Sequence, residues 1–260
     1  MLRVSVVIPT CERPRLLERA LRSVAAQERP PAEVIVVNDG DPQHSAAAHA
    51  AGRALALAAL TVTPNRRGKG ASGARNSGAA LASGDVLAFL DDDDEWAPSY
   101  LREVTRRWDA ARLDVVCTDL VLRFDDGTER PGKGAPDELV ASHFLTRNPG
   151  LIGSNLAIRR TLYAAVGGFD ESLRAATDMD FGLRLSLRGG VRFAPVHLPL
   201  VVHHQHREAR LCTPRGEAMR AGIRRFYELH GQRMTEAQRE DFRRRVGRLW
   251  GIDEHGRDAG

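Results

Sequence analysis

The chain has 260 residues, of which 42% are hydrophobic and 28% are charged. That composition can bury the core of one large α/β domain or two small ones, and it excludes a fully disordered chain. No stretch approaches the ~20 apolar residues of a membrane span, and the N-terminal residues lack the pattern of a signal peptide.

The three cysteines, Cys11, Cys117 and Cys212, are far apart. This usage predicts reduced thiols in a cytoplasmic protein, without disulfides or a zinc site.

The formal net charge is +4, and the excess is concentrated near the C-terminus. Residues 203–248 contain 12 Arg against 6 Asp and Glu, so the remainder of the chain is close to neutral. No nucleic-acid-binding motif accompanies this charge, and we therefore expect no nucleic-acid partner. The Arg-rich segment predicts instead contact with an anionic acceptor, or peripheral contact with an anionic membrane surface at the inner face.

The first 120 residues alternate between runs typical of strands and helices. Short, continuous apolar runs predict strands buried on both faces, and helical spacing or alanine-rich sequence predicts the segments between them. Repetition of this kind favours a parallel, doubly wound sheet. The predicted strands are Val4–Ile8, Val34–Val37, Thr61–Thr63 and Val86–Leu90, and the predicted helices cover residues 14–24, 44–60 and 74–82.

The second half of the chain is less regular. Residues 131–150 hold three Pro and three Gly, which predicts a loop containing a short helix over 138–145. The strands expected here are 115–122, 156–158, 191–193 and 198–202, and the helices are 98–110, 160–166, 179–187, 214–230 and 235–249.

Polar clusters follow three of the predicted strands: residues 10–13, 38–41 and 91–95. Ligands bind at the carboxyl ends of strands in open parallel sheets, and the crossover rule places all three clusters at one edge. The third cluster contains four consecutive aspartates, Asp91 to Asp94. Adjacent carboxylates repel one another, so a divalent cation bound through oxygen ligands is one interpretation. The other is a solvated acidic turn or a helix N-cap.

A glycine-rich loop precedes the third predicted helix. Residues 68–73, GKGASG, match G-x-G-x-x-G, the pattern of dinucleotide-binding loops. The loop lies in the third strand–helix unit rather than the first, which weakens the interpretation as a dehydrogenase. A Gly-rich helix N-terminus beside Arg66, Arg67 and Arg75 also suits a diphosphate. No P-loop and no G-x-S-x-G nucleophile motif is present.

Five stretches, in this order, resemble the family 2 glycosyltransferases, which use nucleotide sugars and have the GT-A fold. The resemblance implies a Rossmann-like mixed α/β sheet flanked by helices. A catalytic domain would span 1–205, with a nucleotide-sugar-binding half (1–120) and an acceptor half (121–205), followed by a helical extension over 206–260. The stretches are VSVVIPTCERPRLLERALRSV, EVIVVNDGD, GARNSGAALASGDVLAFLDDDDEW, SNLAIRR and GGFDESLRAATDMDFGLRL.

The resemblance also implies roles for particular residues. Asp178 would be the general base, Asp93 the best metal ligand, and the metal Mn²⁺ or Mg²⁺. His206 lies where relatives place an Arg-x-His element and would be a further metal or diphosphate ligand. Thr177 replaces the acid that usually precedes the base, so the choice between Asp178 and Asp180 stays open. The substrate-binding set implied is Thr10, Glu12, Asp39, Arg75, Asp91 and Asp92.

The predicted activity is metal-dependent, inverting transfer of a sugar from a nucleotide donor, with UDP the expected carrier, to an acceptor hydroxyl. The acceptor could be a small molecule, a peptide or a lipid-linked glycan. A retaining or nucleotidyl-transfer enzyme on the same fold is one alternative. A sugar-nucleotide-binding protein without activity is another.

Overall fold

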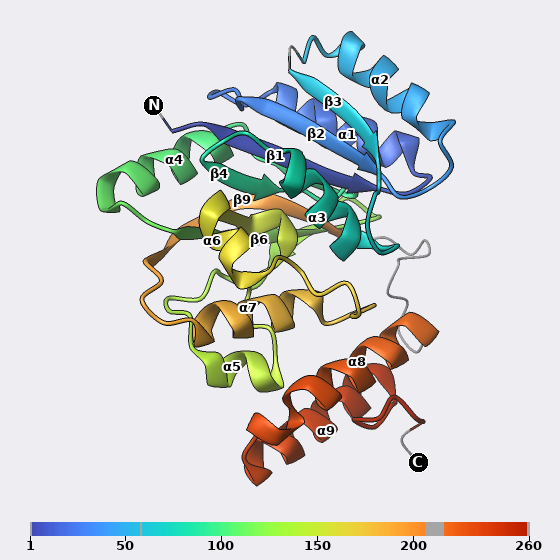
Figure 1. Ribbon diagram of the computed structural model, residues 1–260, viewed down its shortest axis with the longest axis vertical. Helices are drawn as coiled ribbons and strands as arrows, with labels where there is room; N and C mark the ends of the chain where they lie inside the picture. Colours follow the sequence, from blue (N-terminus) through green and yellow to red (C-terminus); the bar gives the residue numbers. More distant parts are fainter. Residues whose placement is uncertain (1, 58, 206–215, 259–260) are drawn as a thin grey trace.

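The predicted parallel strands are present in a computed structural model, which describes residues 2–57, 59–205 and 216–258 (Figure 1). Strand β1 pairs in parallel with β2 and β4, and β2 pairs in parallel with β3. The prediction of a parallel sheet is therefore confirmed for the first half of the chain. These strands are β1 (Val4–Thr10), β2 (Glu33–Asn38), β3 (Leu60–Pro64) and β4 (Val86–Phe89).

The parallel strands are continuous in apolar residues because both of their faces are covered. Within β1, Val7 belongs to one hydrophobic core, whereas Val6 and Ile8 belong to a second core on the opposite face. This alternation follows from the two-residue period of a strand. The three intervening helices are α1 (Pro14–Ala25), α2 (His44–Ala54) and α3 (Ala71–Leu81). The second helix is shorter than predicted, because the chain turns through a left-handed Ala56 before β3.

The second half of the chain extends the same sheet with strands of both directions. Among the described residues, nine strands form one mixed sheet in the order β3-β2-β1-β4-β8-β6-β9-β5, with β7 beside β6. Strand β8 is antiparallel to β4 and β6, whereas β6 and β9 are parallel. The additional strands are β5 (Asp94–Trp96), β6 (Val115–Phe124), β7 (Glu129–Pro131), β8 (Leu156–Arg159) and β9 (Phe193–Gln205).

One long strand, β9, replaces the two short strands expected at 191–193 and 198–202, so that prediction was wrong. Pro195 and Pro199 both lie within β9, although proline donates no backbone hydrogen bond. The ladder between β6 and β9 instead changes register around Asp119, opposite Pro199, and then continues. Strands β5 and β7 were not predicted, since each has only three residues.

Helices cover both faces of the sheet and continue beyond it toward the C-terminus (Figure 1). In the part of the chain that is described, none of them is both long enough and apolar enough to span a membrane. The helices of the second half are α4 (Tyr100–Ala111), α5 (Ala141–Thr146), α6 (Arg160–Val166), α7 (Thr177–Leu187), α8 (Glu217–His230) and α9 (Glu236–Trp250).

Helices α8 and α9 pack against the body of the protein through apolar and ionic contacts. Phe226 and Phe242 belong to the same hydrophobic core as Phe181 of α7. His230 Nε2 lies 2.9 Å from Asp180 Oδ1, and both side chains are buried. Asp180 also accepts hydrogen bonds from Arg184 at 2.7 and 2.9 Å. The Arg-rich helices are thus fixed to α7 at its N-terminal turn.

Replacing Asp180 by asparagine is expected to lower the free energy of unfolding by about 3–5 kcal/mol, the usual cost of removing one partner from a buried ion pair. Arg184 and His230 would both lose their carboxylate. Chemical denaturation at neutral pH measures the change. Arg257→Ser is the control, because Arg257 and its partner Asp253 form an exposed pair. A loss below 1 kcal/mol, similar to that of the control, would contradict this account of how α8 is held.

Candidate active site

A cavity of about 460 Å³ opens where the parallel strands end. Its walls come from the loops after β1, β2 and β4, the N-termini of α3 and α7, and residues of α8 and α9. All three polar clusters predicted to meet at one edge of the sheet contribute to it. Of the predicted site residues, the cavity is lined by Thr10, Asp39, Arg75, Asp91, Asp92, Asp93 and Asp178.

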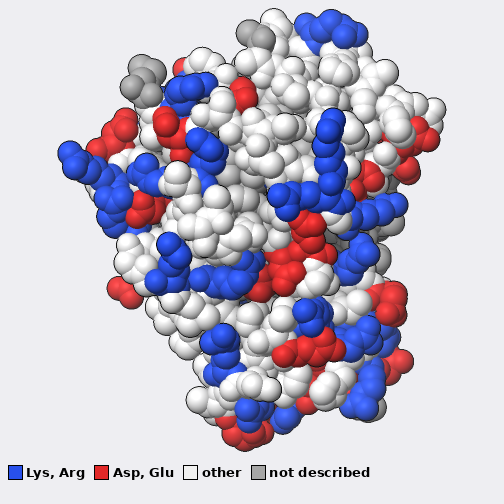
Figure 2. All heavy atoms as spheres, in the orientation of Figure 1, with Lys and Arg blue, Asp and Glu red and all other residues white. Residues whose placement is uncertain are grey.

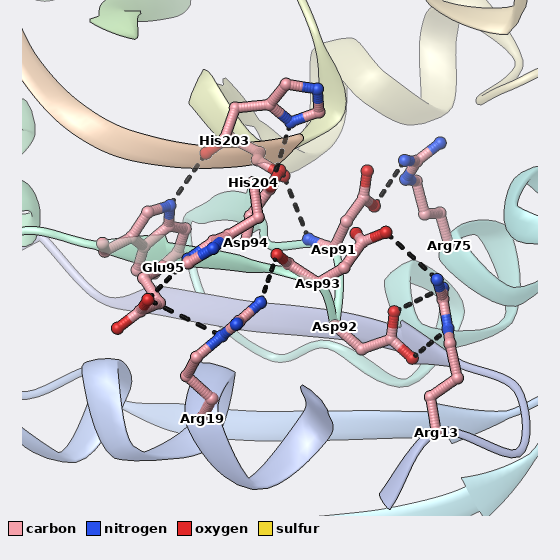
Figure 3. A network of polar contacts seen from close by, with 12 residues as sticks. Arg13, Arg19, Arg75, Asp91, Asp92, Asp93, Asp94, Glu95, His203 and His204 are labelled. Carbon is pink, nitrogen blue, oxygen red and sulfur yellow. Dashed lines mark hydrogen bonds and ion pairs between the residues drawn. The ribbon is translucent and has the colours of Figure 1, made fainter. Parts of the chain in front are cut away.

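The four aspartates form a tight turn between β4 and β5. The N–H of Asp94 donates to the carbonyl of Asp91 at 3.0 Å, which closes the turn. Strand β5 then pairs antiparallel with β9, so that Asp94 lies opposite His203. Because the backbone reverses here, successive side chains point in different directions (Figure 3).

Three of these aspartates converge on one point. Oxygens of Asp91, Asp93 and Asp94 all lie within 4.8 Å of one another. Asp91 and Asp93 are partly exposed to the cavity, whereas Asp94 is buried beneath them. Three carboxylates at this spacing are the donor set that hard divalent cations prefer. The resemblance implied Asp93 as a metal ligand, and the structure places Asp91 and Asp94 beside it.

Asp92 points away from the other three and is fully buried. It accepts a hydrogen bond from Thr10 Oγ1 at 2.7 Å and from Arg13 Nη2 at 2.5 Å. Arg13 also contacts Asp93 at 3.0 Å. Asp92 thus fixes the loop after β1 to the acidic turn, a role that the spacing of the residues did not indicate.

Each acid of the run has a cationic or hydrogen-bonding partner (Figure 3). Arg75 contacts Asp91 at 2.5 Å, and Ser154 donates to Asp94 at 2.5 Å. His203 lies 2.9 Å from Asp94. The repulsion within the run is therefore largely offset by the protein itself. The charge of the run by itself therefore does not decide between a bound cation and an acidic turn, and the case for a metal rests on the convergence of three carboxylates.

The glycine-rich loop is held by carboxylates from other segments. The N–H of Gly70 donates to Asp39 at 2.8 Å, and that of Gly68 donates to Glu171 at 2.8 Å. Asp39 also accepts from Asn65 at 2.6 Å. Two loop amides predicted to bind a diphosphate are therefore already used. A Cβ at Gly73 would lie 1.7 Å from the carbonyl oxygen of Gly68, so glycine is required there for close packing.

Two predicted site residues are not placed in the cavity by the structure. Glu12 does not line it: this residue has a left-handed backbone (φ 56°) and its side chain lies over Gly40. His206 lies outside the described residues. Its neighbour His203 does line the cavity, whereas His204 contacts Glu95 at 2.6 Å (Figure 3).

Asp178 and Asp180 have different surroundings, although both belong to the first turn of α7. Asp178 lines the cavity, and its Oδ1 has no hydrogen-bond partner among the described residues. Burial and the nearby Asp91 raise the pKa of Asp178 to about 6, against the opposing effect of Arg75. Asp180 does not line the cavity and is occupied by its ion pairs with Arg184 and His230.

Residues 5–167 match the family described as Glycosyl transferase family 2, which covers more than half of the chain. The chain is a family 2 glycosyltransferase. The glycosyltransferase is 31% identical, over half of its length, to an uncharacterized glycosyltransferase of Nostoc, and spans 39% of that protein. It is 29% identical over 75% of its length to the uncharacterized glycosyltransferase YwdF of Bacillus subtilis, and spans 72% of that relative.

Solved structures show that the glycosyltransferase has the GT-A fold. A crystal structure of TarS from S. aureus, in complex with UDP-GlcNAc, matches 95% of this chain and 72% of its own, with a TM-score of 0.67 at 19% identity. The mannosyltransferase PcManGT from Pyrobaculum calidifontis, in complex with GDP-Man and Mn²⁺, matches 90% of this chain and 65% of its own, with a TM-score of 0.63 at 19% identity.

Several cavity residues of the glycosyltransferase were not identified from the sequence. Ser72 Oγ is buried at the start of α3 without a partner among the described residues, and Lys69 precedes it in the loop. Arg245 and Trp250 of α9 line the far wall. The GKGAS loop was a signal for the first two, whereas no local pattern places α9 at a cavity formed by strand ends.

Proposed function

We propose that this glycosyltransferase moves a sugar from a nucleotide diphosphate donor to an acceptor hydroxyl, with inversion at the anomeric carbon. One observation carries the proposal. Asp91 and Asp93, two of the three convergent carboxylates, and a separate carboxylate, Asp178, line the same cavity, and Oδ1 of Asp178 has no hydrogen-bond partner among the described residues. The convergent carboxylates can bind a cation with a diphosphate, and Asp178 can accept a proton.

The donor would bind along the ends of β1, β2 and β4. Thr10, Asp39, Lys69 and Ser72 line this part of the cavity and offer hydroxyl, carboxylate and ammonium groups. Similarity of fold to TarS, solved with UDP-GlcNAc, supports UDP as the carrier. PcManGT, solved with GDP-Man, makes a guanine donor the alternative to test.

The carboxylates of Asp91, Asp93 and Asp94 fit a divalent cation by donor type and by spacing. Mn²⁺ in the PcManGT complex supports the choice between Mn²⁺ and Mg²⁺ without deciding it. When bound, such an ion would neutralise charge on the departing nucleotide diphosphate. Asp91 and Asp93 each have one arginine partner, Arg75 and Arg13, and Arg13 also binds Asp92, whereas Asp94 is buried and contacts His203 and Ser154.

In the proposed step, the acceptor oxygen forms a bond to the anomeric carbon as the bond from that carbon to the diphosphate breaks. The hydroxyl proton passes to Asp178. Attack from the face opposite the leaving group inverts the anomeric configuration. A base positioned for this transfer contributes about 10²–10⁴-fold to the rate.

Hydrolysis of a panel of UDP- and GDP-sugars in the presence of Mn²⁺ or Mg²⁺ tests the proposed function. Release of one nucleotide above background identifies the donor. Nucleotide binding without release from any sugar would favour the alternative of a binding protein. Retention of configuration in the product would favour a retaining enzyme on the same fold.

The pH dependence of kcat should follow the ionisation of Asp178. A base acts only when deprotonated, so activity is expected to be constant above pH 6 and to fall about tenfold per pH unit below it. The midpoint should lie near 6, rather than near 4, because burial raises the pKa of this carboxyl. Steady-state turnover between pH 4.5 and 8, with saturating donor, measures the profile. A midpoint at or below pH 4.5 would contradict Asp178 as the group observed.

A further inference from the structure

The wall of the cavity formed by α9 carries positive charge. Arg245 and Trp250 line the cavity, together with Asn148 from the loop after α5. In Figure 1, α7 lies between this wall and the parallel strands, where the donor is proposed to bind. Asp178, in the first turn of α7, and the α9 wall line the same cavity.

Arg245 lines the cavity, and three further cations from three segments lie near it: Arg248 of α9, Arg147 after α5 and Lys133 after β7. Burial lowers the pKa of Arg245, and the nearby Arg248 and Arg147 lower it further. Burial likewise lowers the pKa of Lys133, followed by the effect of Arg245 and Arg147. Lys133 and Arg245 thus experience the repulsion of their neighbours.

These arginines lack the partners that most others on the C-terminal helices have. Arg220 pairs with Asp258, Arg239 with Glu236, and Arg243 with Glu254. On the face shown in Figure 2, basic and acidic side chains are interspersed in the same way. Within the described ranges, Arg147, Arg245 and Arg248 make no ion pair. Asp241, an acid whose charge acts on Arg245, is paired with Arg244 at 2.9 Å.

A purely structural role explains only part of this cluster. Cations in the last turn of a helix interact favourably with its dipole, which accounts for Arg248 near the C-terminus of α9. It does not account for Arg147 and Lys133, which belong to other segments and raise the repulsion. Lys133 is held in place by a hydrogen bond to the carbonyl of Asn148 at 2.6 Å.

We infer that this cluster, Lys133, Arg147, Arg245 and Arg248, is a subsite for an anionic group of the acceptor. The inference rests on the proposed function and specifies the acceptor class: a molecule that carries a phosphate near the hydroxyl that reacts. Arginine binds phosphate oxygens through paired N–H donors, and a bound dianion would remove the repulsion among the four cations. The donor diphosphate is a separate ligand, because its site lies at the strand ends.

Inorganic phosphate is the probe for this subsite. The full chain is saturated with UDP and Mg²⁺, so that the donor site is filled, and melted at constant ionic strength with and without 50 mM phosphate. Phosphate is expected to raise the melting temperature of the wild type by about 3 °C, which is the shift for a ligand present at about ten times its Kd. Arg245→Ser should lose the rise. Arg224→Ser should retain it, because Arg224 is exposed on α8 outside the cavity and this variant has the same net charge.

Equal rises in the wild type and Arg245→Ser, or no rise in either, would overturn the inference. So would a rise that disappears when UDP is added, since phosphate would then occupy the donor site. Failure of UDP and Mg²⁺ to raise the melting temperature would count against the proposed function instead.

Sedimentation with phosphatidylglycerol vesicles separates two sources of the phosphate. Pelleting lost in Arg245→Ser together with the phosphate effect indicates a lipid-linked acceptor, and no pelleting of the wild type indicates a soluble one. Pelleting lost without any phosphate effect would make the cluster a lipid-binding surface and overturn the inference.

Discussion

Asp178→Asn is expected to lower kcat by about 10³-fold while leaving the affinity for UDP unchanged. Asparagine has nearly the same shape as aspartate but cannot take the proton of the acceptor hydroxyl. Asp178 makes no ion pair in the described part of the chain, and its Oδ1 has no partner, so the substitution should cost little stability. Turnover at saturating donor and acceptor, together with calorimetry for UDP, separates the chemical step from binding.

Asp180→Asn is the matched control for this prediction. It removes the same charge two residues away, from a carboxylate that is buried and does not line the cavity. We expect Asp180→Asn to lower the melting temperature and to keep kcat within about threefold at a temperature where it is folded. If Asp180→Asn lost turnover and Asp178→Asn kept it, the base would be Asp180. Substantial turnover in both variants would point to the retaining or nucleotidyl-transfer alternative.

The position of the cavity could be predicted from the sequence because it follows from a general rule. Val4–Thr10 and Glu33–Asn38 are runs buried on both faces, and a sheet of such strands binds ligands at their carboxyl ends. Polar residues directly after these runs were therefore candidates. The GT-A fold and the family were implied by the resemblance of five stretches, in order, to the family 2 glycosyltransferases, and both are confirmed.

The directions of the aspartate side chains could not be predicted, since they depend on a turn and on partners distant in sequence. Asp92 is turned from the cluster by Thr10 and Arg13, about 80 residues earlier. Asp94 joins the cluster because β5 pairs with β9, more than 100 residues later. The sequence showed five acids in a row but not the arginines and histidines that offset them.

The contribution of α8 and α9 to the cavity was also beyond local patterns. Their arginines suggested a charged surface, whereas the structure divides them into paired arginines and the few that converge beside the cavity. That division depends on the packing of α9 on α5 and on the loop that follows α5. Helical periodicity shows which side of a helix is apolar, but not which distant loop it meets.

Asp93→Asn is expected to abolish the dependence of UDP binding on Mn²⁺ and to lower turnover by at least about 100-fold, in line with the several kcal/mol that a metal ion can contribute. Asp93 is partly exposed to the cavity, and its side-chain partner is Arg13. Its Arg13 contact is shared with Asp92, which keeps that arginine in place in the variant. Calorimetry with UDP, with and without Mn²⁺, measures the loss directly.

In the absence of metal, Asp93→Asn is expected to be at least as stable as the wild type, although it loses activity. Two charges 4.8 Å apart repel by roughly 3 kcal/mol at an effective dielectric of 20, so removing Asp93 relieves repulsion from Asp91 and Asp94. We expect the melting temperature without metal to be equal to or above that of the wild type, and the rise on adding Mn²⁺ to disappear. Asp109→Asn, an exposed substitution on α4 outside the cavity, should leave both values unchanged. A Mn²⁺ effect that persists in Asp93→Asn would exclude Asp93 as a ligand. A melting temperature well below that of the wild type would instead mean that Asp93 holds Arg13 and the loop after β1 in place.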